Sequence, residues 1–158
     1  MVEAFKKAVE DFLAQRRLAV TGVSRSGAEA ANLIYRKLRE AGYEVFAVNP
    51  NAAEVEGDRS YPDLKSIPGS VDGVVVATHP RVSEQIVKDC AELGIARVWM
   101  HRSFGAGSVS AAAVQFCRDK GITVIAGGCP MMFCKPVDVG HRCMRWILGL
   151  TGGLPRGA

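Results

Sequence analysis

The sequence lacks any long apolar stretch. No segment of its 158 residues approaches the ~20 apolar residues that a membrane-spanning helix needs, and its tight apolar runs, such as Val74 to Ala77, have the length of a strand. The first 17 residues lack the apolar core and small-residue cleavage site of a secretion signal. Five cysteines, an odd number, do not suit a disulfide framework. We therefore expect a cytoplasmic protein with reduced thiols and no membrane partner.

The sequence also lacks a cluster of charges of one sign. The formal net charge is +4, and the basic residues are scattered rather than aligned on one face, which argues against nucleic acid as a partner. A mild positive excess does favour phosphorylated metabolites. Apolar residues make up 48% and charged residues 23%, close to globular averages, and the length suits one domain.

Helical and strand patterns alternate along this domain. Strand patterns cover 17–21, 44–48, 72–77, 97–100 and 122–126, and helical patterns cover 2–13, 81–93 and 108–118. A further helix carries its apolar face at Ala31, Ile34, Tyr35 and Leu38, and Ser26 with Glu29 forms a capping box that predicts its start. Wholly apolar strands are typical of parallel sheets. We predict an α/β fold with a doubly wound, five-stranded parallel sheet in a single domain.

A glycine-bounded turn, Gly22 to Gly27, separates the first of these strands from the next helix. Such a turn aims backbone N–H groups and the positive end of a helix dipole at one point, where phosphate can bind. The P-loop is excluded because Ala28 and Glu29 follow the second glycine, and the NAD fingerprint fails because Ser24 replaces its middle glycine. The alternative is a plain connection whose glycines only satisfy dihedral angles.

The second strand lacks the acidic residue that binds both ribose hydroxyls of NAD, and Asn49-Pro50-Asn51 follows it instead. A site without that carboxylate suits a ribose with an extra phosphate, as in NADP or coenzyme A. This segment could equally be an ordinary turn. Thr78-His79-Pro80 likewise matches an ordinary helix start, whereas the His101 to Gly105 loop could contact adenine or phosphate. The residues nominated for ligand binding are Gly22, Ser24, Arg25, Ser26, Asn49, Pro50, Asn51, Thr78, His79, Pro80, His101 and Cys129.

Cys129 follows the last strand in Gly127-Gly128-Cys129-Pro130 and is the one candidate nucleophile. We expect its thiol to face the ligand rather than the core, with a nucleophilic role less favoured than either. Cys90 and Cys117 lie on apolar helix faces and are interpreted as core residues. The spacing of Cys129, Cys134, His141 and Cys143 matches no common zinc pattern, so no metal site is expected.

These features together resemble the small stand-alone CoA-binding proteins and the CoA-binding domain of the succinyl-CoA synthetase α-subunit. The resemblance rests on L-A-V-T-G-V-S at 18–24, G-Y-E-V-F-A-V-N-P-N at 42–51, G-D-R-S-Y-P-D-L at 57–64, V-D-G-V-V-V-A-T-H-P at 71–80 and G-G-C-P at 127–130. It implies a Rossmann-like fold with a CoA site at the strand ends. The chain stops where the synthetase continues into its phosphohistidine domain, so ligase activity is not carried over.

A helical extension at about 131–158 has no counterpart in the core fold. Val139, Cys143, Ile147 and Leu150 form an apolar stripe at helical spacing, which is more typical of core packing than of a partner surface. Whether it docks on its own domain or on a second copy stays open, and with it the prospect of a homo-oligomer.

The sequence as a whole predicts a protein that binds coenzyme A or an acyl-CoA, without identifiable catalytic machinery. The first alternative is a thiol enzyme that uses Cys129 on a thioester or disulfide. The second is an NADP-binding reductase, which Ser24 disfavours.

Overall fold

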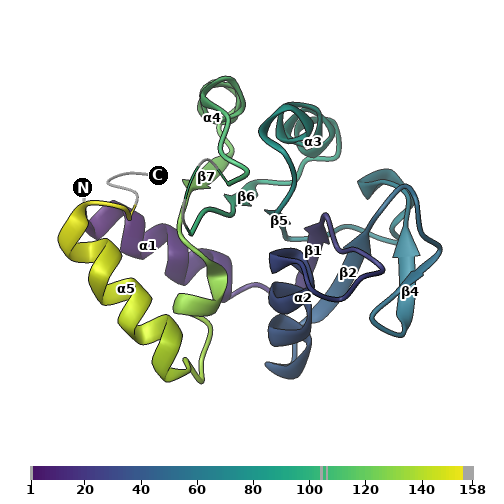
Figure 1. Ribbon diagram of the computed structural model, residues 1–158. Helices are drawn as coiled ribbons and strands as arrows, with labels where there is room; N and C mark the ends of the chain where they lie inside the picture. The colour runs from purple at the N-terminus through teal and green to yellow at the C-terminus, as the bar shows by residue number, and fades with distance from the viewer. Residues whose placement is uncertain (1, 104, 106, 155–158) are drawn as a thin grey trace.

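A seven-stranded sheet forms the centre of the protein in the computed structural model, which describes residues 2–103, 105 and 107–154. Helices cover both faces of this sheet (Figure 1). The elements are α1 (Val2–Leu13), β1 (Arg17–Thr21), α2 (Ala30–Glu40), β2 (Glu44–Val48), β3 (Glu54–Val55), β4 (Asp58–Tyr61), the 3-10 helix η1 (Leu64–Ser66), β5 (Gly73–Val76), α3 (Pro80–Glu92), β6 (Arg97–Met100), α4 (Ala111–Asp119), β7 (Thr123–Ala126), the 3-10 helix η2 (Pro130–Met132) and α5 (Val139–Thr151).

The strand order is β3-β4-β2-β1-β5-β6-β7, and every pair except β3–β4 is parallel. All five predicted strands are present, but the predicted count was wrong because β3 and β4 extend the sheet beyond β2. Without the antiparallel β3, the order is that of dinucleotide-binding folds. Strand order reverses between β1 and β5, so a crevice for a ligand is expected where these two strands end.

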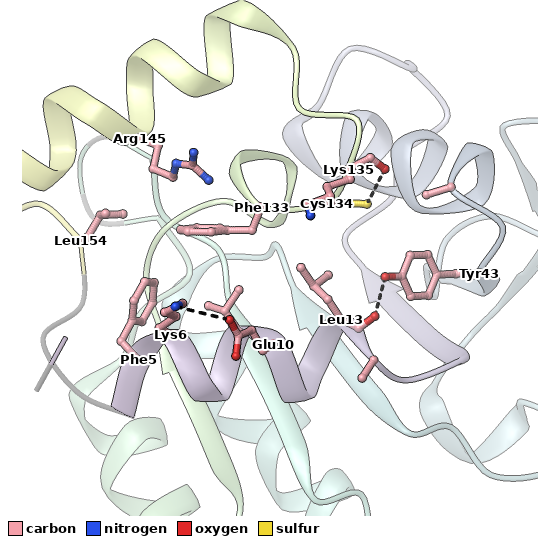
Figure 2. Close-up of a pocket in the computed structure, with 13 residues that line it drawn as sticks. Phe5, Lys6, Glu10, Leu13, Tyr43, Phe133, Cys134, Lys135, Arg145 and Leu154 are labelled. Atoms are coloured by element: carbon pink, nitrogen blue, oxygen red, sulfur yellow. Dashed lines mark hydrogen bonds and ion pairs between the residues drawn. The ribbon is translucent and has the colours of Figure 1, made fainter. Parts of the chain in front are cut away.

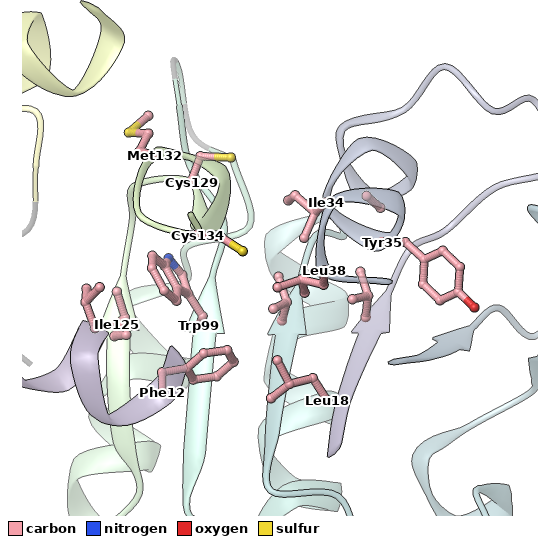
Figure 3. Close-up of a cluster of buried hydrophobic side chains, with 14 of the residues drawn as sticks. Phe12, Leu18, Ile34, Tyr35, Leu38, Trp99, Ile125, Cys129, Met132 and Cys134 are labelled. Atoms are coloured by element: carbon pink, nitrogen blue, oxygen red, sulfur yellow. The ribbon is translucent and has the colours of Figure 1, made fainter. Parts of the chain in front are cut away.

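Two apolar cores flank the sheet because successive strand residues point to opposite faces. Val75 faces the core that α1, α2 and α5 cover, whereas Val74 and Val76 face the core under α3 and α4. Figure 1 shows these two helical layers on opposite sides of the strands. In the first core, Phe12 packs edge-on against Trp99, with ring centroids 5.4 Å apart (Figure 3).

The β3–β4 hairpin turns through Glu56 and Gly57, which have φ angles of 53° and 77°. Val55 pairs with Asp58 across this two-residue turn. Positive φ at both central residues is the type I′ geometry that matches the twist of paired strands. Glu56 is thereby held beside α2, where it contacts Asn32 and Arg36.

Helix α2 begins at Ala30, so the capping box predicted at Ser26 and Glu29 is wrong. Glu29 is the N-cap residue and its side chain makes no capping bond. The Ser26 hydroxyl instead contacts the Ser24 hydroxyl, at 2.7 Å between oxygens. The connection between β1 and α2 is therefore longer than expected.

Helix α5 buries only Leu148, while Val139, Ile147 and Leu150 are 66%, 47% and 69% exposed and Cys143 is exposed as well. The expectation that its apolar stripe packs into the core is therefore wrong. Residues 155–158 of the predicted extension lie outside the described residues. No described helix is both long and apolar enough to cross a bilayer.

Candidate functional site

The turn after β1 lies directly against the end of β5. The Gly22 N–H continues the sheet by donating to the Val48 carbonyl at 3.1 Å. Gly22 has φ +88°, and a Cβ there would lie 2.3 Å from the Ala77 carbonyl oxygen. Only glycine permits so close a passage of the two strand ends at this backbone angle. The turn is thus placed at the point where the strand order reverses.

Asn32 fastens this turn to α2. Its side chain is fully buried; Oδ1 accepts from the Ser24 N–H at 2.9 Å, and Nδ2 donates to the Ser24 carbonyl at 2.7 Å. Nδ2 also donates to Glu56 Oε1 at 2.6 Å. A buried amide with all these partners holds a loop rigidly. Sequence reasoning missed Asn32, although a polar residue between the buried Ala31 and Ile34 was a signal.

Glu56 and Arg36 complete the fastening. Arg36 Nη1 lies 2.7 Å from Glu56 Oε1 and donates to the Gly27 carbonyl at 3.2 Å. The bond from Asn32, followed by that from Arg36, lowers the pKa of Glu56 below its ordinary value. Glu56 is therefore an anion that neutralises Arg36. The positive charge of Arg36 is therefore paired within the protein rather than open to a ligand.

Several donors of the turn remain open. The N–H groups of Arg25, Gly27 and Ala28 have no hydrogen-bond partner among the described residues. The Arg25 side chain is exposed and likewise unpaired within the described part of the chain. Backbone amides beside an exposed guanidinium form a donor set suited to an anion.

Thr78 adds an unsatisfied polar atom beside this turn. Its Oγ1 is buried without a hydrogen-bond partner among the residues that the structure describes, and its methyl lies 3.1 Å from the position of a Cβ on Gly22. A buried hydroxyl without a partner is destabilising unless a ligand or water satisfies it. The end of β5 therefore fits a polar ligand group.

Asn49, by contrast, has its amide committed. Its Nδ2 donates to the Val23 carbonyl at 2.7 Å, and its Oδ1 accepts from the Asn51 N–H at 2.8 Å. Asn49 thus positions the β1 turn from the end of β2, while Pro50 and Asn51 are exposed on the same edge. The alternative of an ordinary turn describes these contacts well.

The remaining nominated residues cap helices or brace loops. His79 is the N-cap of α3, where its Nδ1 accepts from the Arg81 N–H at 3.3 Å, and Pro80 is the first helical residue. His101 Nε2 lies 3.1 Å from Ser103 Oγ, and burial lowers the pKa of His101, so its ring is neutral near pH 7. Phe104, expected in the same loop, lies outside the described residues.

The prediction that the Cys129 thiol faces the ligand is wrong in this structure. Cys129 is 3% exposed and belongs to the first core with Met132 and Cys134 (Figure 3). Burial raises the pKa of Cys129 to about 11, against the opposing effect of the Met131 N–H. The interpretation of Cys90 and Cys117 as buried core thiols is confirmed. No three His, Cys, Asp or Glu side chains gather as a metal site within the described ranges.

A hollow of about 730 Å³ lies away from the strand ends. It lies between α1 and the segment from Phe133 to Lys135, and Tyr43, Arg145 and Leu154 complete its wall (Figure 2). Its lining is mostly apolar. Lys6 faces Glu10 at 3.9 Å and Arg145 donates to the Met132 carbonyl at 3.2 Å, so two of the three lining cations already have partners. The open donors of the β1 turn indicate the site better than this hollow does.

The strand order and the turn at its reversal define a Rossmann-like, doubly wound protein with open backbone N–H donors at one edge of its sheet. The chain belongs to the CoA binding domain family, whose model matches residues 16–135.

Relatives agree with this membership. The chain is 29% identical over 114 residues to the uncharacterized protein YneT of Bacillus subtilis, which covers 72% of this chain and 82% of YneT. It is 31% identical over 85 residues to the alpha subunit of an ADP-forming acetate–CoA ligase of Pyrococcus furiosus, covering 53% of this chain but 19% of that subunit. A solved structure of a conserved hypothetical protein from Pyrococcus furiosus is 32% identical, with a TM-score of 0.63 over 72% of this chain and 93% of that one.

Proposed function

We propose that this protein binds coenzyme A or an acyl-CoA at the C-terminal edge of its sheet, with the phosphates on the β1 turn. The observation that carries the proposal is the set of open donors at the reversal of strand order, namely three backbone N–H groups and the exposed Arg25. Phosphate oxygens accept from such donors. Membership of the CoA binding domain family supports the same ligand.

The end of β2 argues for this ligand over NAD. The first residue beyond β2 is Asn49, whose side-chain N–H already donates to the Val23 carbonyl. It offers no carboxylate to a pair of ribose hydroxyls, which NAD recognition requires. Ligands that carry a phosphate on the ribose escape this requirement, and coenzyme A is one of them.

Cys129 gives the thiol-enzyme alternative little support. With 3% exposure and a pKa raised to about 11, its thiol is protonated and shielded near pH 7. We therefore propose a role in binding, carrying or sensing the CoA ligand. The ligase chemistry of the acetate–CoA ligase relative is not transferred, because the match spans 19% of that subunit.

Titration calorimetry with coenzyme A, NADP and NADH tests the proposal. We expect heat of binding with coenzyme A and none with NADH at the same concentrations. Dephospho-coenzyme A, which lacks the ribose phosphate, separates the contribution of that phosphate from that of the diphosphate. Micromolar binding of NADH without binding of coenzyme A would overturn the proposal.

A further inference from the structure

The outward face of α5 carries an uninterrupted apolar stripe. Its side chains are 66%, 68%, 47% and 69% exposed at Val139, Trp146, Ile147 and Leu150, and the exposed Cys143 lies between them. The inward face of the same helix is also apolar and buries Leu148. A helix that is apolar on two opposite faces is normally covered on both. One face of α5 is thus left without a partner within the described chain.

The spacing within the stripe indicates what covers it. Val139, Cys143, Trp146 and Leu150 are separated by 4, 3 and 4 residues, the heptad spacing of a helix that packs along another helix. This spacing reads the same in both directions. An antiparallel copy of α5 therefore places Val139 opposite Leu150 and Cys143 opposite Trp146, twice over, as a two-fold axis demands.

Size and charge agree with such a pairing. The large Trp146 meets the small Cys143, which lets the two helices approach evenly. None of the stripe residues is charged. The guanidinium of Arg145 is turned away, because it donates to the Met132 carbonyl at 3.2 Å and stacks on Phe133 at 5.6 Å. The exposed Arg142 remains at the rim, where interfaces are usually polar.

The area is also sufficient. At half to two-thirds exposure the stripe presents roughly 500 Å², within the ~300–600 Å² of the largest apolar patch that a typical monomer carries. Two stripes face to face remove up to about 1,000 Å² from water, the size of a weak, concentration-dependent interface.

We infer that α5 is a self-association surface and that the protein pairs with a second copy through antiparallel α5 helices. The contact lies on the layer opposite α3 and α4 (Figure 1). The question of a homo-oligomer, which the sequence left open, thereby gains a defined surface.

Sedimentation or light scattering over a range of concentrations tests this pairing with the full chain. We expect a dimer for the wild type and a monomer for Trp146→Glu, whose dissociation constant rises by about 100-fold or more as expected for a central interface tryptophan. Val82→Glu is the matched control, because Val82 is 48% exposed on α3, outside the stripe. It should leave the dimer intact, and circular dichroism should show that both variants fold.

A single substitution and an exchange of two residues distinguish antiparallel pairing from other contacts. Cys143→Trp alone sets Trp opposite Trp and should weaken the dimer, whereas Cys143→Trp with Trp146→Cys restores a large residue opposite a small one and should recover it. In the wild type, thiol labelling of Cys143 should slow as protein concentration rises.

A wild type that stays monomeric at several hundred micromolar overturns the inference. So does a dimer that Trp146→Glu leaves unchanged, or a monomer whose Trp146 fluorescence shifts on anionic lipid vesicles, which would assign the stripe to a lipid surface.

Discussion

Two turns at the C-terminal edge of the sheet differ although their sequences are alike. Each has a strand followed at once by glycine, Gly22 after β1 and Gly127 after β7. The β1 turn is held by polar side chains and keeps donors open, whereas the β7 turn is sealed by apolar packing around Cys129 and receives the Trp99 Nε1–H at 3.1 Å. The difference comes from the neighbouring helices. Helix α2 supplies Asn32 and Arg36 to one turn, and the other turn continues into the buried η2.

The largest loss of stability should follow from a side-chain atom placed between the ends of β1 and β5. Gly22→Ala places a Cβ 2.3 Å from the Ala77 carbonyl at φ +88°, so we expect a loss of about 3 kcal/mol or more in the free energy of unfolding. Gly42→Ala is the matched control, since Gly42 has φ +91° and a Cβ there would have no described heavy atom within 4 Å beyond its chain neighbours. It should cost about 1 kcal/mol. Equal losses in denaturant titrations would show that backbone angle alone requires Gly22.

Asn32→Asp breaks the polar fastening without changing the shape of the side chain. Two donated bonds are lost and a carboxylate is set beside Glu56, so we expect a loss of about 2–3 kcal/mol at pH 7. Glu56→Gln in the same chain should recover part of it by removing the second charge. A double variant no more stable than Asn32→Asp would mean that relief of the carboxylate repulsion does not exceed the loss of the Arg36–Glu56 ion pair.

The pH dependence of this variant has a definite sign. Asn32 and Arg36 lower the pKa of Glu56 in the folded protein, so its stabilising effect is present above its ordinary pKa of 4.5 and is lost as pH falls through the lowered value. In Asn32→Asp, acid also removes the repulsion between the two carboxylates. The stabilities of wild type and variant should therefore converge as pH falls below 4.5. A constant gap in acid melts would contradict this account.

Arg25→Ala tests whether the open donors serve a ligand. Loss of a charge-assisted bond should weaken coenzyme A binding by about 10- to 150-fold and less at high salt, with unfolding unchanged to about 0.5 kcal/mol. Arg118→Ala removes the same charge from the last turn of α4, which leads into the N-terminal end of β7, far from the β1 turn along the strands. This control should leave the affinity for coenzyme A unchanged. Calorimetry of both variants decides. Equal weakening would mean that net charge, rather than contact, attracts the ligand.

The smallest effect is expected at the sealed end. Cys129→Ala should lower stability by about 1 kcal/mol near pH 7. Because folding raises the pKa of Cys129 from 9.0 to about 11, the wild-type advantage should be full below pH 9 and shrink as pH rises toward 11. Thiol labelling at pH 8 should modify the exposed Cys143 well before Cys129. Faster labelling of Cys129 would reopen its role as a nucleophile.

The strands of the central sheet could be predicted because Val, Ile and Leu runs mark buried parallel strands. The β3–β4 hairpin could not, since Glu54, Asp58 and Arg59 interrupt any apolar pattern and β3 has two residues. Its signal was the Glu56-Gly57 pair at the type I′ turn. The missed strands also hid Glu56, which depends on that turn to reach Asn32.

Residue position along the chain predicted which segments lie at the C-terminal edge of the sheet but not where each side chain points. Cys129 follows a strand like the other nominated residues, yet its thiol turns into the core because η2 begins there. Ser26 carries a good capping side chain, yet it bonds to Ser24 and the helix starts later. Such outcomes depend on neighbours far away in the sequence, which local patterns do not contain.

The first strand of the chain, β1, lies in the middle of the sheet, and this affects biosynthesis. It pairs with β2 on one side, but its other edge waits for β5. At 5–20 residues per second, the 55 residues from Thr21 to Val76 take roughly 3 to 11 s to synthesise. For those seconds an apolar strand edge, Leu18 to Val20, has no second partner. The nascent chain should therefore be most prone to aggregation, and most dependent on chaperones, just before β5 emerges.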